Sequence, residues 1–554
     1  MPPISAYWNT LRYLKPVQIY GRVWFRLYKP KPDLHRAPSL RLKSGLWEMP
    51  AQRKKSMLGH ETFCFLNAVF PLDAVGWNGP RPDKLWFYNL HYFDDLNAED
   101  AGLRTQWHLA LLKRWLVENP PTAGNGWESY PISLRIVNWI KWSLAGNSLT
   151  NDCLNSLAIQ ARWLYRHIEW HLLGNHIFAN AKALVYAGLF FEGDEAQAWL
   201  NKGLSILYKE LPEQVLADGG NFERSTMYHA IFLEDVLDLV NVSRAYARCI
   251  AASVSETWID ASIRMLKWAK GMLHPDGQIA LFNDAAFYIA PEPDQLFAYA
   301  ARLSVQWTGS SCHSRNEALL LSHWPESGYI RMSSAASVVL IDAALVGPDY
   351  LPGHAHADTL SFEMSVFGLR VVVNGGTSCY GVSARRTLER KTISHSTVEV
   401  AEQDSSEVWS GFRVARRAYP FGLQCAEDHQ TLWVGCSHDG YCRLPGKPVH
   451  RREWRMHTGG LSVRDFVTNG QYRSLARYII HPQVNFTFDV QNNSGCIVLP
   501  DGRSIFVKVS AGRAYLEESS YAPEFGKILS AQCLVVELEN GESETRWSWS
   551  ETLN

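Results

Sequence analysis

The sequence predicts an α+β protein with a helical N-terminal half and an antiparallel β-sandwich in its C-terminal half. From about residue 97 to 310, apolar side chains recur at the three- and four-residue intervals of helices that bury one face. After about residue 325, short runs alternate apolar and polar residues and end at Gly, Asn or Asp turns, as in packed antiparallel sheets. We therefore expect one domain over residues 1–320 and a second over residues 321–554.

The helical half is a succession of amphipathic segments separated by short Gly, Pro or Asn breaks. No fixed-length repeat is present, so we expect antiparallel helix pairs that are stacked or closed into a ring. Residues from 1 to about 80 are expected to form a helical extension of this domain. The clearest helical segments cover residues 105–119, 133–146, 153–173 and 231–254.

The β half contains a stretch that raises a chemical question. In "PGHAHADTLSFEM", His354, His356 and Asp358 alternate, so they would share one face if the stretch were a strand. Such a face fits a metal site, an acid/base centre or a solvated strand end. The strands themselves are predicted within residues 333–345, 360–376, 395–402, 431–440, 460–470, 473–490, 495–510 and 533–540.

Composition excludes several classes of protein. The 554 residues are 46% hydrophobic and carry a net charge of −1, so no global field favours nucleic acid or a membrane surface. The 22 Trp, 23 Tyr and 23 Phe fit a glycan-binding cleft or, more simply, a helical core. Ten scattered cysteines without a CxxC motif, no secretory leader pattern and no long apolar run predict a cytoplasmic protein with reduced thiols and no transmembrane segment.

Polar residues interrupt the apolar pattern at several predicted helix ends. Each has a structural interpretation as well as a functional one; Asn175, for example, is a good helix cap, and His176 and His229 fit a core with satisfied histidines. Their concentration at helix ends favours a shared cleft. Besides those three residues, the candidates are Trp127, Glu128, Tyr130, Arg135, Asn138, Trp139, Glu223, Arg224, Tyr228, Asp276, Asn283, Asp284, Arg385, Arg386, Arg390 and His395.

An ordered set of motifs resembles the heparinase II/III family of polysaccharide lyases. The motifs are "GNHIFANAKALVYAG", "DGGNFERSTMYH", "PGHAHADTLSFEM" with "NGGTSCYG", "SHSTVEV" and "AEQDSSEVWSGFRVARRA". They span roughly residues 85 to 420 in the family's order. The resemblance implies an incomplete α/α toroid followed by antiparallel β-sheets, in agreement with the periodicity.

The resemblance also implies roles for three residues. Asn175 matches the position that neutralises the uronate carboxylate, Tyr228 the tyrosine that acts as acid or base, and His354 the catalytic histidine of the β domain. Around them we expect the substrate to contact Trp127, Glu128, Arg135, Asn138, His176, Glu223, Arg224, His229 and Arg390.

A structural zinc ion is a further implication of the resemblance, at His356 and His395. The family's third ligand is an Asp, but this sequence has Asn374, and a neutral amide compensates the charge of zinc less well. Either Asp358 replaces that ligand or the histidines join a metal-free hydrogen-bond network. No cofactor is required for the chemistry itself.

The predicted reaction is β-elimination on a uronic-acid-containing polysaccharide or oligosaccharide. A base removes the C5 proton, donors stabilise charge on the carboxylate, and an acid protonates the leaving oxygen at C4. Two alternatives stay open: a uronate C5-epimerase that reprotonates the same carbanion on a capsule or exopolysaccharide, and a glycan-binding protein without turnover. A glycoside hydrolase is disfavoured because no persuasive carboxylate pair is present, although Glu128 and Glu223 keep it conceivable.

Overall fold

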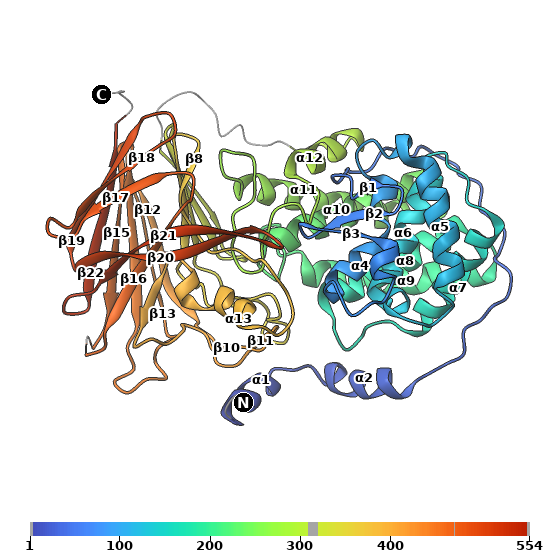
Figure 1. Cartoon of the computed structure of the whole chain (residues 1–554), viewed down its shortest axis with the longest axis horizontal. Helices are drawn as coiled ribbons and strands as arrows, with labels where there is room; N and C mark the ends of the chain where they lie inside the picture. The colour runs from blue at the N-terminus through green and yellow to red at the C-terminus, as the bar shows by residue number, and fades with distance from the viewer. Residues whose placement is uncertain (1–3, 308–318, 470, 551–554) are drawn as a thin grey trace.

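The computed structural model describes residues 4–307, 319–469 and 471–550, which form a helical half and a β half side by side (Figure 1). The helical half confirms the predicted texture. Its main helices are α4 (Lys84–Tyr92), α5 (Thr105–Glu118), α6 (Ser129–Leu144), α7 (Asn151–Arg166), α8 (Gly174–Phe190), α9 (Asp194–Gln214), α10 (Thr226–Ala245), α11 (Ala252–Gly271) and α12 (Pro293–Arg302). Short 3₁₀ turns lie at η1 (Asp94–Asn97), η2 (Ala101–Arg104) and η3 (Asn125–Trp127).

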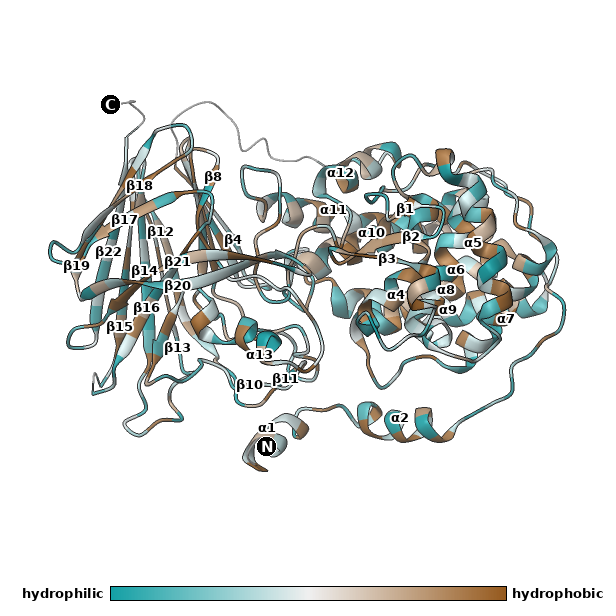
Figure 2. Ribbon diagram, in the orientation of Figure 1, coloured by the Kyte–Doolittle hydropathy of each residue, from teal (hydrophilic) through white to brown (hydrophobic). Residues whose placement is uncertain are grey.

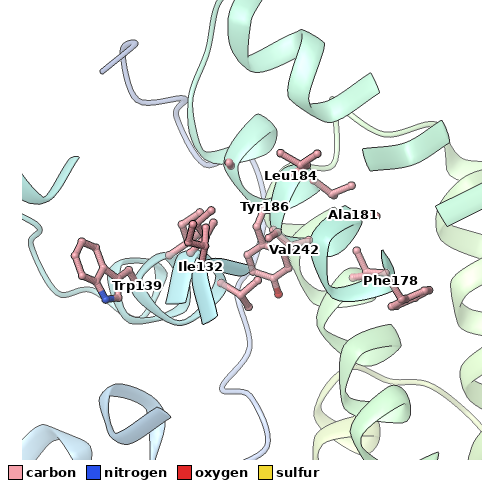
Figure 3. Packing of buried hydrophobic residues seen from close by; sticks show 14 of the residues in the cluster. Ile132, Trp139, Phe178, Ala181, Leu184, Tyr186 and Val242 are labelled. Atoms are coloured by element: carbon pink, nitrogen blue, oxygen red, sulfur yellow. The ribbon is translucent and has the colours of Figure 1, made fainter. Parts of the chain in front are cut away.

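Helix α8 is buried along almost its whole length, because its sequence is apolar on every side. Figure 3 shows Phe178 and Leu184 of α8 in one buried cluster with Ile132 of α6 and Val242 of α10. The N-terminal end of α8 is therefore held rigidly. That end, like the start of α10, faces the β half.

The β half is a sandwich of two antiparallel sheets with a dry core between them. Val434, Trp454 and Trp547 are buried there, and the two tryptophans alternate along their strands with more exposed residues. One sheet has the order β12-β13-β14-β15-β22-β19-β18-β17 and the other β20-β21-β16-β8-β7-β6-β5-β4, with β9 paired to β16.

Although β4, β12, β14, β20 and β22 lie outside the predicted runs, each predicted run overlaps at least one of the strands of these two sheets. In the first sheet they are β12 (Pro420–Glu427), β13 (Leu432–His438), β14 (His450–His457), β15 (Gly460–Val467), β17 (Asn485–Asp489), β18 (Ser494–Val498), β19 (Ser504–Ala511) and β22 (Glu542–Trp549). In the second they are β4 (Leu320–Trp324), β5 (Tyr329–Ser333), β6 (Ser337–Asp342), β7 (Phe362–Val366), β8 (Leu369–Val373), β9 (Val398–Val400), β16 (Ser474–Ile480), β20 (Arg513–Glu524) and β21 (Lys527–Glu537). A hairpin of β10 (Val408–Trp409) and β11 (Arg413–Val414), the helix α13 (Ala384–Arg390) and the turn η4 (Thr392–Ser394) lie beside them.

Two local predictions are wrong. Strand β7 begins only at Phe362, so residues 352–361 form a loop and His354, His356 and Asp358 do not share a strand face. The expected helical extension is helical only in α1 (Ile4–Leu11), α2 (Pro16–Leu27) and the single turn α3 (Leu72–Val75). Residues 28–56 are largely extended, and β1 (Met57–Gly59), β2 (Thr62–Phe65) and β3 (Ala68–Pro71) form a small antiparallel sheet. The predicted domain boundary between residues 320 and 321 falls at the start of β4 (Leu320–Trp324), and residues 308–318 lie outside the described residues.

Helices α1 and α2 form an N-terminal strap, defined here as residues 4–27, that runs across both halves (Figure 1). Thr10 Oγ1 donates to the Val414 carbonyl at 3.2 Å, and Gln18 Nε2 donates to the Tyr350 carbonyl at 3.0 Å. The strap alternates hydrophobic and hydrophilic residues (Figure 2), and it leaves Trp8 and Trp24 exposed. Within the described ranges, no helix is both long enough and apolar enough to cross a bilayer.

Candidate active site

A cavity of about 560 Å³ opens between the two halves and the strap. Its walls come from the start of α8, the start of α10, the loop before β7 and the β10–β11 hairpin. The predicted site residues that line it are Asn138, Asn175, His176, Glu223, Tyr228 and His354. The structure thus brings together the three residues for which the resemblance implies roles.

Tyr228 is positioned by the cap of α10. Ser225 is the N-cap residue, and its hydroxyl accepts a hydrogen bond from the Tyr228 backbone N–H at 3.1 Å, as Ser favours at this position. The Tyr228 phenol lies 3.0 Å from the Tyr380 hydroxyl. Burial, and then the neighbouring Tyr380, raise the pKa of Tyr228 well above its usual value. Tyr228 is therefore a neutral proton donor at neutral pH.

His354 stacks on Tyr228, with ring centroids 3.8 Å apart. Its Nδ1 lies 2.9 Å from Asp284 Oδ2, and because a carboxylate accepts, Nδ1 carries the proton. The Asp284 backbone N–H also donates to the His354 carbonyl at 2.9 Å, so the two residues are joined twice. His354 Nε2 is left as the unprotonated nitrogen, which is the arrangement that a general base requires.

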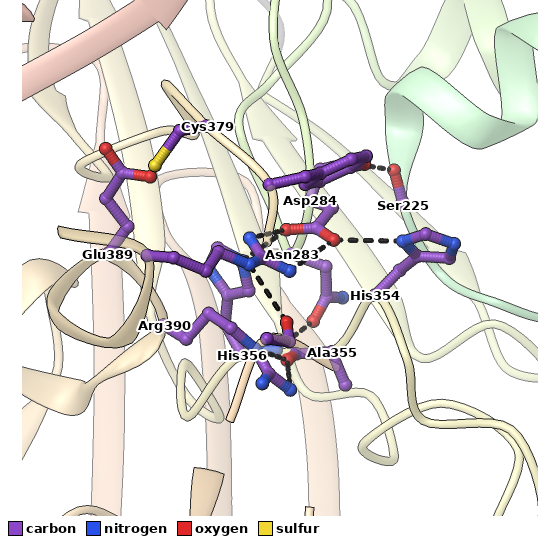
Figure 4. Close-up of polar contacts among 12 residues, drawn as sticks. Ser225, Asn283, Asp284, His354, Ala355, His356, Cys379, Glu389 and Arg390 are labelled. Carbon is purple, nitrogen blue, oxygen red and sulfur yellow. Dashed lines mark hydrogen bonds and ion pairs between the residues drawn. The ribbon is translucent and has the colours of Figure 1, made fainter. Parts of the chain in front are cut away.

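Asp284 is the centre of a buried polar network (Figure 4). Arg386 donates from both terminal nitrogens, to Oδ1 and, at 2.7 Å, to Oδ2. His356 Nε2 lies 2.8 Å from Oδ1. Burial opposes ionisation of Asp284, but Arg386 and the two histidines hold its pKa well below the usual value. The carboxylate is therefore a fixed negative charge behind His354.

Asn175 and His176 occupy the first turn of α8, where backbone N–H groups point outward. The helix starts at Gly174 with a positive φ of +55°, and a Cβ there would meet Leu351 Cδ2 at 2.5 Å. The Asn175 side chain lies near the Tyr130 phenol, which also lines the cavity. Burial disfavours a charged His176, but Glu169, 3.2 Å from its Nδ1, raises the pKa of His176 above the usual value. An amide and a histidine that readily protonates thus lie side by side, as an anionic group would require.

Glu223 lines the cavity beside His354. Its Oε2 is 3.6 Å from His354 Nε2, beyond hydrogen-bond distance, and this oxygen has no hydrogen-bond partner among the described residues. Burial raises the pKa of Glu223, opposed by His354 and by the backbone N–H of Asn175. The acid form of Glu223 is therefore more favoured than it would be in water.

Three predicted substrate contacts lie in the walls of the helical half instead of in the cavity. Arg135 is fully buried and donates to Gln160, to the His91 carbonyl and to the Gly126 carbonyl. Trp127 is buried against Trp115. Glu128 pairs with Lys84 at 2.8 Å and accepts from Tyr88, which lines the cavity while Glu128 does not. These groups are already satisfied, so the structure assigns them a packing or supporting role.

Arg224, His229 and Arg390 also lie outside the cavity lining. Arg224 donates to the Ser327 carbonyl and links α10 to the β half, while His229 stacks on Trp268, and burial lowers its pKa to about 3. Arg390 donates to the Ala355 carbonyl from two nitrogens and so fixes the loop between His354 and His356. Asn138 does line the cavity, but its amide N–H groups donate to the Tyr92 carbonyl and to Asp94.

His356 and His395 form a hydrogen-bonded pair, with Nδ1 and Nε2 3.2 Å apart. The Asn374 amide oxygen accepts the Ser396 N–H and its amide nitrogen donates to Ser361, so it is engaged elsewhere. Among the described residues, no three His, Cys, Asp or Glu side chains are grouped as metal ligands. These residues therefore do not fit a zinc site of the usual composition.

A second network in the sandwich supports this interpretation. There His450 Nδ1 lies 3.1 Å from His438 Nε2, His450 Nε2 lies 2.8 Å from Asp465, and Arg452 donates to the same carboxylate at 2.7 Å. The chain thus builds an Asp–Arg–His–His network twice. The copy at Asp465 is a structural element of the core, which shows that such a network satisfies its own charges.

Three residues of the site were not predicted as such. Asp284 and Arg386 were noted only as members of polar clusters, and Tyr380 lies in "NGGTSCYG" without a separate prediction. Tyr228 and Tyr380 are 152 residues apart, and His354 and Asp284 are 70 residues apart. No spacing rule connects such pairs, so only the fold reveals them.

Comparison with known proteins agrees with this architecture. Residues 97–295 match the family description "Heparinase II/III N-terminus", and residues 318–550 match "Heparinase II/III-like, C-terminal". A heparin-sulfate lyase of Bacteroides stercoris is 31% identical over 113 residues, which cover 20% of this chain and 17% of that protein. A heparin-sulfate lyase of Pedobacter heparinus is 23% identical over 268 residues, or 46% of this chain and 40% of that protein. Both alignments therefore cover less than half of each protein.

Solved structures share the fold over more of the chain. The heparan sulfate lyase of Pedobacter heparinus superposes with a TM-score of 0.58 at 17% identity, covering 89% of this chain and 82% of that one. A heparinase III superposes with a TM-score of 0.65 at 17% identity, covering 84% and 76%. From its sequence matches and its toroid-plus-sandwich architecture, the chain belongs to the heparinase II/III family.

Proposed function

We propose that this protein is a polysaccharide lyase that cleaves a uronic-acid-containing glycan by β-elimination. The observation that carries the proposal is the meeting of Asn175, Tyr228 and His354 in one cavity, with the proton on His354 fixed by Asp284. The family membership supports the same activity.

The groups have complementary roles. Asn175 donates a hydrogen bond to the uronate carboxylate, and protonated His176 adds positive charge beside it, where negative charge develops as C5 loses its proton. His354 Nε2 takes that proton. The electron pair of the C5–H bond forms the C4–C5 double bond, the C4–O4 bond breaks, and Tyr228 gives its proton to O4.

The stacked arrangement favours elimination over the two alternatives. Epimerisation requires a proton donor on the face opposite the base, whereas the rings of His354 and Tyr228 stack with their centroids 3.8 Å apart. A binding protein without turnover does not need a base beside an acid in its cavity, where His354 and Tyr228 both lie. We therefore retain elimination as the single function.

The test is an assay in heavy water against a panel of unsulfated and sulfated uronate glycans. Elimination gives rising near-ultraviolet absorbance and new alkene proton signals, with Tyr228→Phe and His354→Ala inactive. Deuterium at C5 without absorbance would instead establish an epimerase. Binding of a panel glycan without either change would leave a binding protein.

The proposal also includes a uronic acid in the substrate and a cytoplasmic location for the protein. The uronic acid is required because only a carboxylate at C5 makes that proton removable. A cytoplasmic location is supported by the nine described cysteines, all free thiols, as is usual in a reducing compartment. Cell fractionation with an antibody tests the location independently of activity.

A further inference from the structure

The cations that line the cavity divide into paired and unpaired groups. Arg53 pairs with Glu234 at 2.6 Å, Lys141 and Lys182 each pair with Asp238 at 2.5 Å, and Arg417 pairs with Asp349 at 3.5 Å. Their charges are balanced within the protein. Arg53, Lys141 and Lys182 are thus engaged within the protein, whereas Arg417 Nε and Nη1 lack a hydrogen-bond partner among the described residues.

Arg22 and Arg413 are different. Both line the cavity, and neither guanidinium group has a hydrogen bond or ion pair to any described residue. Burial and then the charge of Arg22 lower the pKa of Arg413, so the two guanidinium groups are close enough to repel each other. Two like charges held in a partly closed cavity without a counter-charge cost stability, and such a cost is typical of a binding site.

The two arginines come from elements that are far apart in sequence and fixed against each other. Arg22 is on α2 of the strap and Arg413 begins β11. Thr10 joins the strap to this hairpin, because its hydroxyl donates to the Val414 carbonyl and accepts from Trp409 Nε1 at 3.1 Å. The arginine pair is therefore positioned before any ligand arrives.

The position of the pair relative to the reacting groups indicates which part of a substrate it would meet. Phe412 precedes Arg413, lines the same cavity and has its ring 6.1 Å from the ring of His354. Consecutive Cα atoms are about 3.8 Å apart, so the backbone of Arg413 lies next to that of Phe412 in the wall of this cavity. An arginine pair here lies beside the reacting sugar, not at its carboxylate, which Asn175 and His176 would bind.

We propose that Arg22 and Arg413 form an oxyanion subsite that binds an acidic group, a carboxylate or a sulfate, on the sugar next to the one cleaved. This inference rests on the proposed lyase function for the identity of the polymer. Guanidinium groups suit the site because each presents planar pairs of N–H donors to two oxygens of the same anion. The strap is then part of the substrate site, and the polymer carries acidic groups on neighbouring sugars.

The first experiment needs no active enzyme. Thermal unfolding of the wild type, Arg22→Gln, Arg413→Gln and the double variant is measured at low ionic strength, with and without sodium sulfate or sodium glucuronate. Arg26→Gln is the matched control, since Arg26 is on the same helix and exposed outside the cavity. We expect the double variant to melt at or above the wild-type temperature, because repulsion is removed, and to gain less from the anions than the wild type and the control do. A lower melting temperature with an unchanged anion response would mean that the arginines are structural and would overturn the proposal.

The second experiment uses a glycan that the wild type cleaves. Each single substitution is expected to raise KM about 10- to 100-fold with kcat nearly unchanged, and Arg26→Gln is expected to leave KM as it is. A larger effect on a sulfated polymer identifies the anion as sulfate, and equal effects on sulfated and unsulfated polymers identify it as carboxylate. If both single variants cleave the glycan with the KM of the wild type, the subsite is refuted but the lyase function is not. If the wild type cleaves no glycan, yet the anions stabilise the wild type more than the double variant, the lyase function is refuted but the subsite is not.

Discussion

The substitution Asp284→Asn separates two roles of one carboxylate. Asp284 fixes the proton on His354 Nδ1 and also balances the buried charge of Arg386. Removing one partner of a buried ion pair costs about 3–5 kcal/mol, and both side chains here are fully buried, so no discount for solvent screening applies. Losing the carboxylate that sets a histidine tautomer costs roughly 10⁴-fold in kcat. Asp284→Asn is thus expected to reduce both stability and turnover.

The second network supplies a matched control. Asp465 is also buried, pairs with Arg452 at 2.7 Å and accepts from His450, but it lies in the sandwich core. Asp465→Asn should lose a similar 3–5 kcal/mol with kcat unchanged. The free energy of unfolding from urea titration and kcat from the absorbance assay, both at a temperature where each variant is folded, give the comparison. Equal loss of kcat in the two variants would show that the effect on turnover is global, and wild-type kcat in Asp284→Asn would refute the role assigned to it.

The difference in unfolding free energy between the wild type and Asp284→Asn should depend on pH. The folded pKa of Asp284 lies below its unfolded value of about 3.9, so its contribution to stability is present above that pH and is lost as pH falls through the folded pKa. Urea titrations at pH 7 and pH 3 should therefore show the gap between the wild type and Asp284→Asn shrinking at the lower pH. A gap that widens in acid would contradict the assignment of Asp284 as an ionised group.

Three further outcomes are expected. Tyr228→Phe should lower kcat about 10²- to 10⁴-fold with KM nearly unchanged, because the proton donor is lost while the ring and its stacking stay. Steady-state kinetics of the variant test this expectation. A kcat near that of the wild type would exclude Tyr228 as the acid. Because the pKa of Glu223 is raised in the folded protein, the wild type should lose stability as pH rises from about 4.3 through the folded pKa. Glu223→Gln should not show this loss when the free energy of unfolding is measured from pH 4 to 8. The same pH profile in the variant and the wild type would contradict the raised pKa. Dialysis against a chelator should change neither melting temperature nor kcat, because His356 and His395 are engaged with each other and no third anionic ligand joins them; a fall in both that zinc restores would show the opposite.

The fold was predictable from sequence because it depends on periodicity. Apolar spacing identified the helices and the alternating strands directly, and this pattern reflects burial of one face against a core. The segment around His354 was mispredicted for a related reason: its alternation of polar and small residues has the period of a strand, but in the structure it belongs to a loop. That loop is fixed by side chains such as Arg390, which donates to the Ala355 carbonyl. Periodicity carries no information about such contacts.

The type of a residue likewise did not reveal whether its side chain is free to bind a ligand. Arg135 was a reasonable candidate for an acidic substrate, but it is fully buried and donates to three groups within the helical half. Arg22 was not selected, yet it lines the cavity without a partner of opposite charge. An arginine binds a ligand only when the protein does not already satisfy its donors, and that condition depends on contacts between segments distant in sequence.

The duplicated network sharpens this argument. Asp284 and Asp465 each hold an arginine and a pair of hydrogen-bonded histidines, so the chemical groups are nearly the same in the two places. The difference is that Asp284 also bonds His354, whose side chain keeps 14% of its surface exposed and faces the cavity beside Tyr228. The Asp465 network therefore balances its charges inside the core. The Asp284 network balances its charges in the same way and also holds His354, the base, at the edge of the cavity. If that is the origin of activity, His354→Ala should abolish turnover with little loss of stability, because Asp284 would keep Arg386 and His356 as partners.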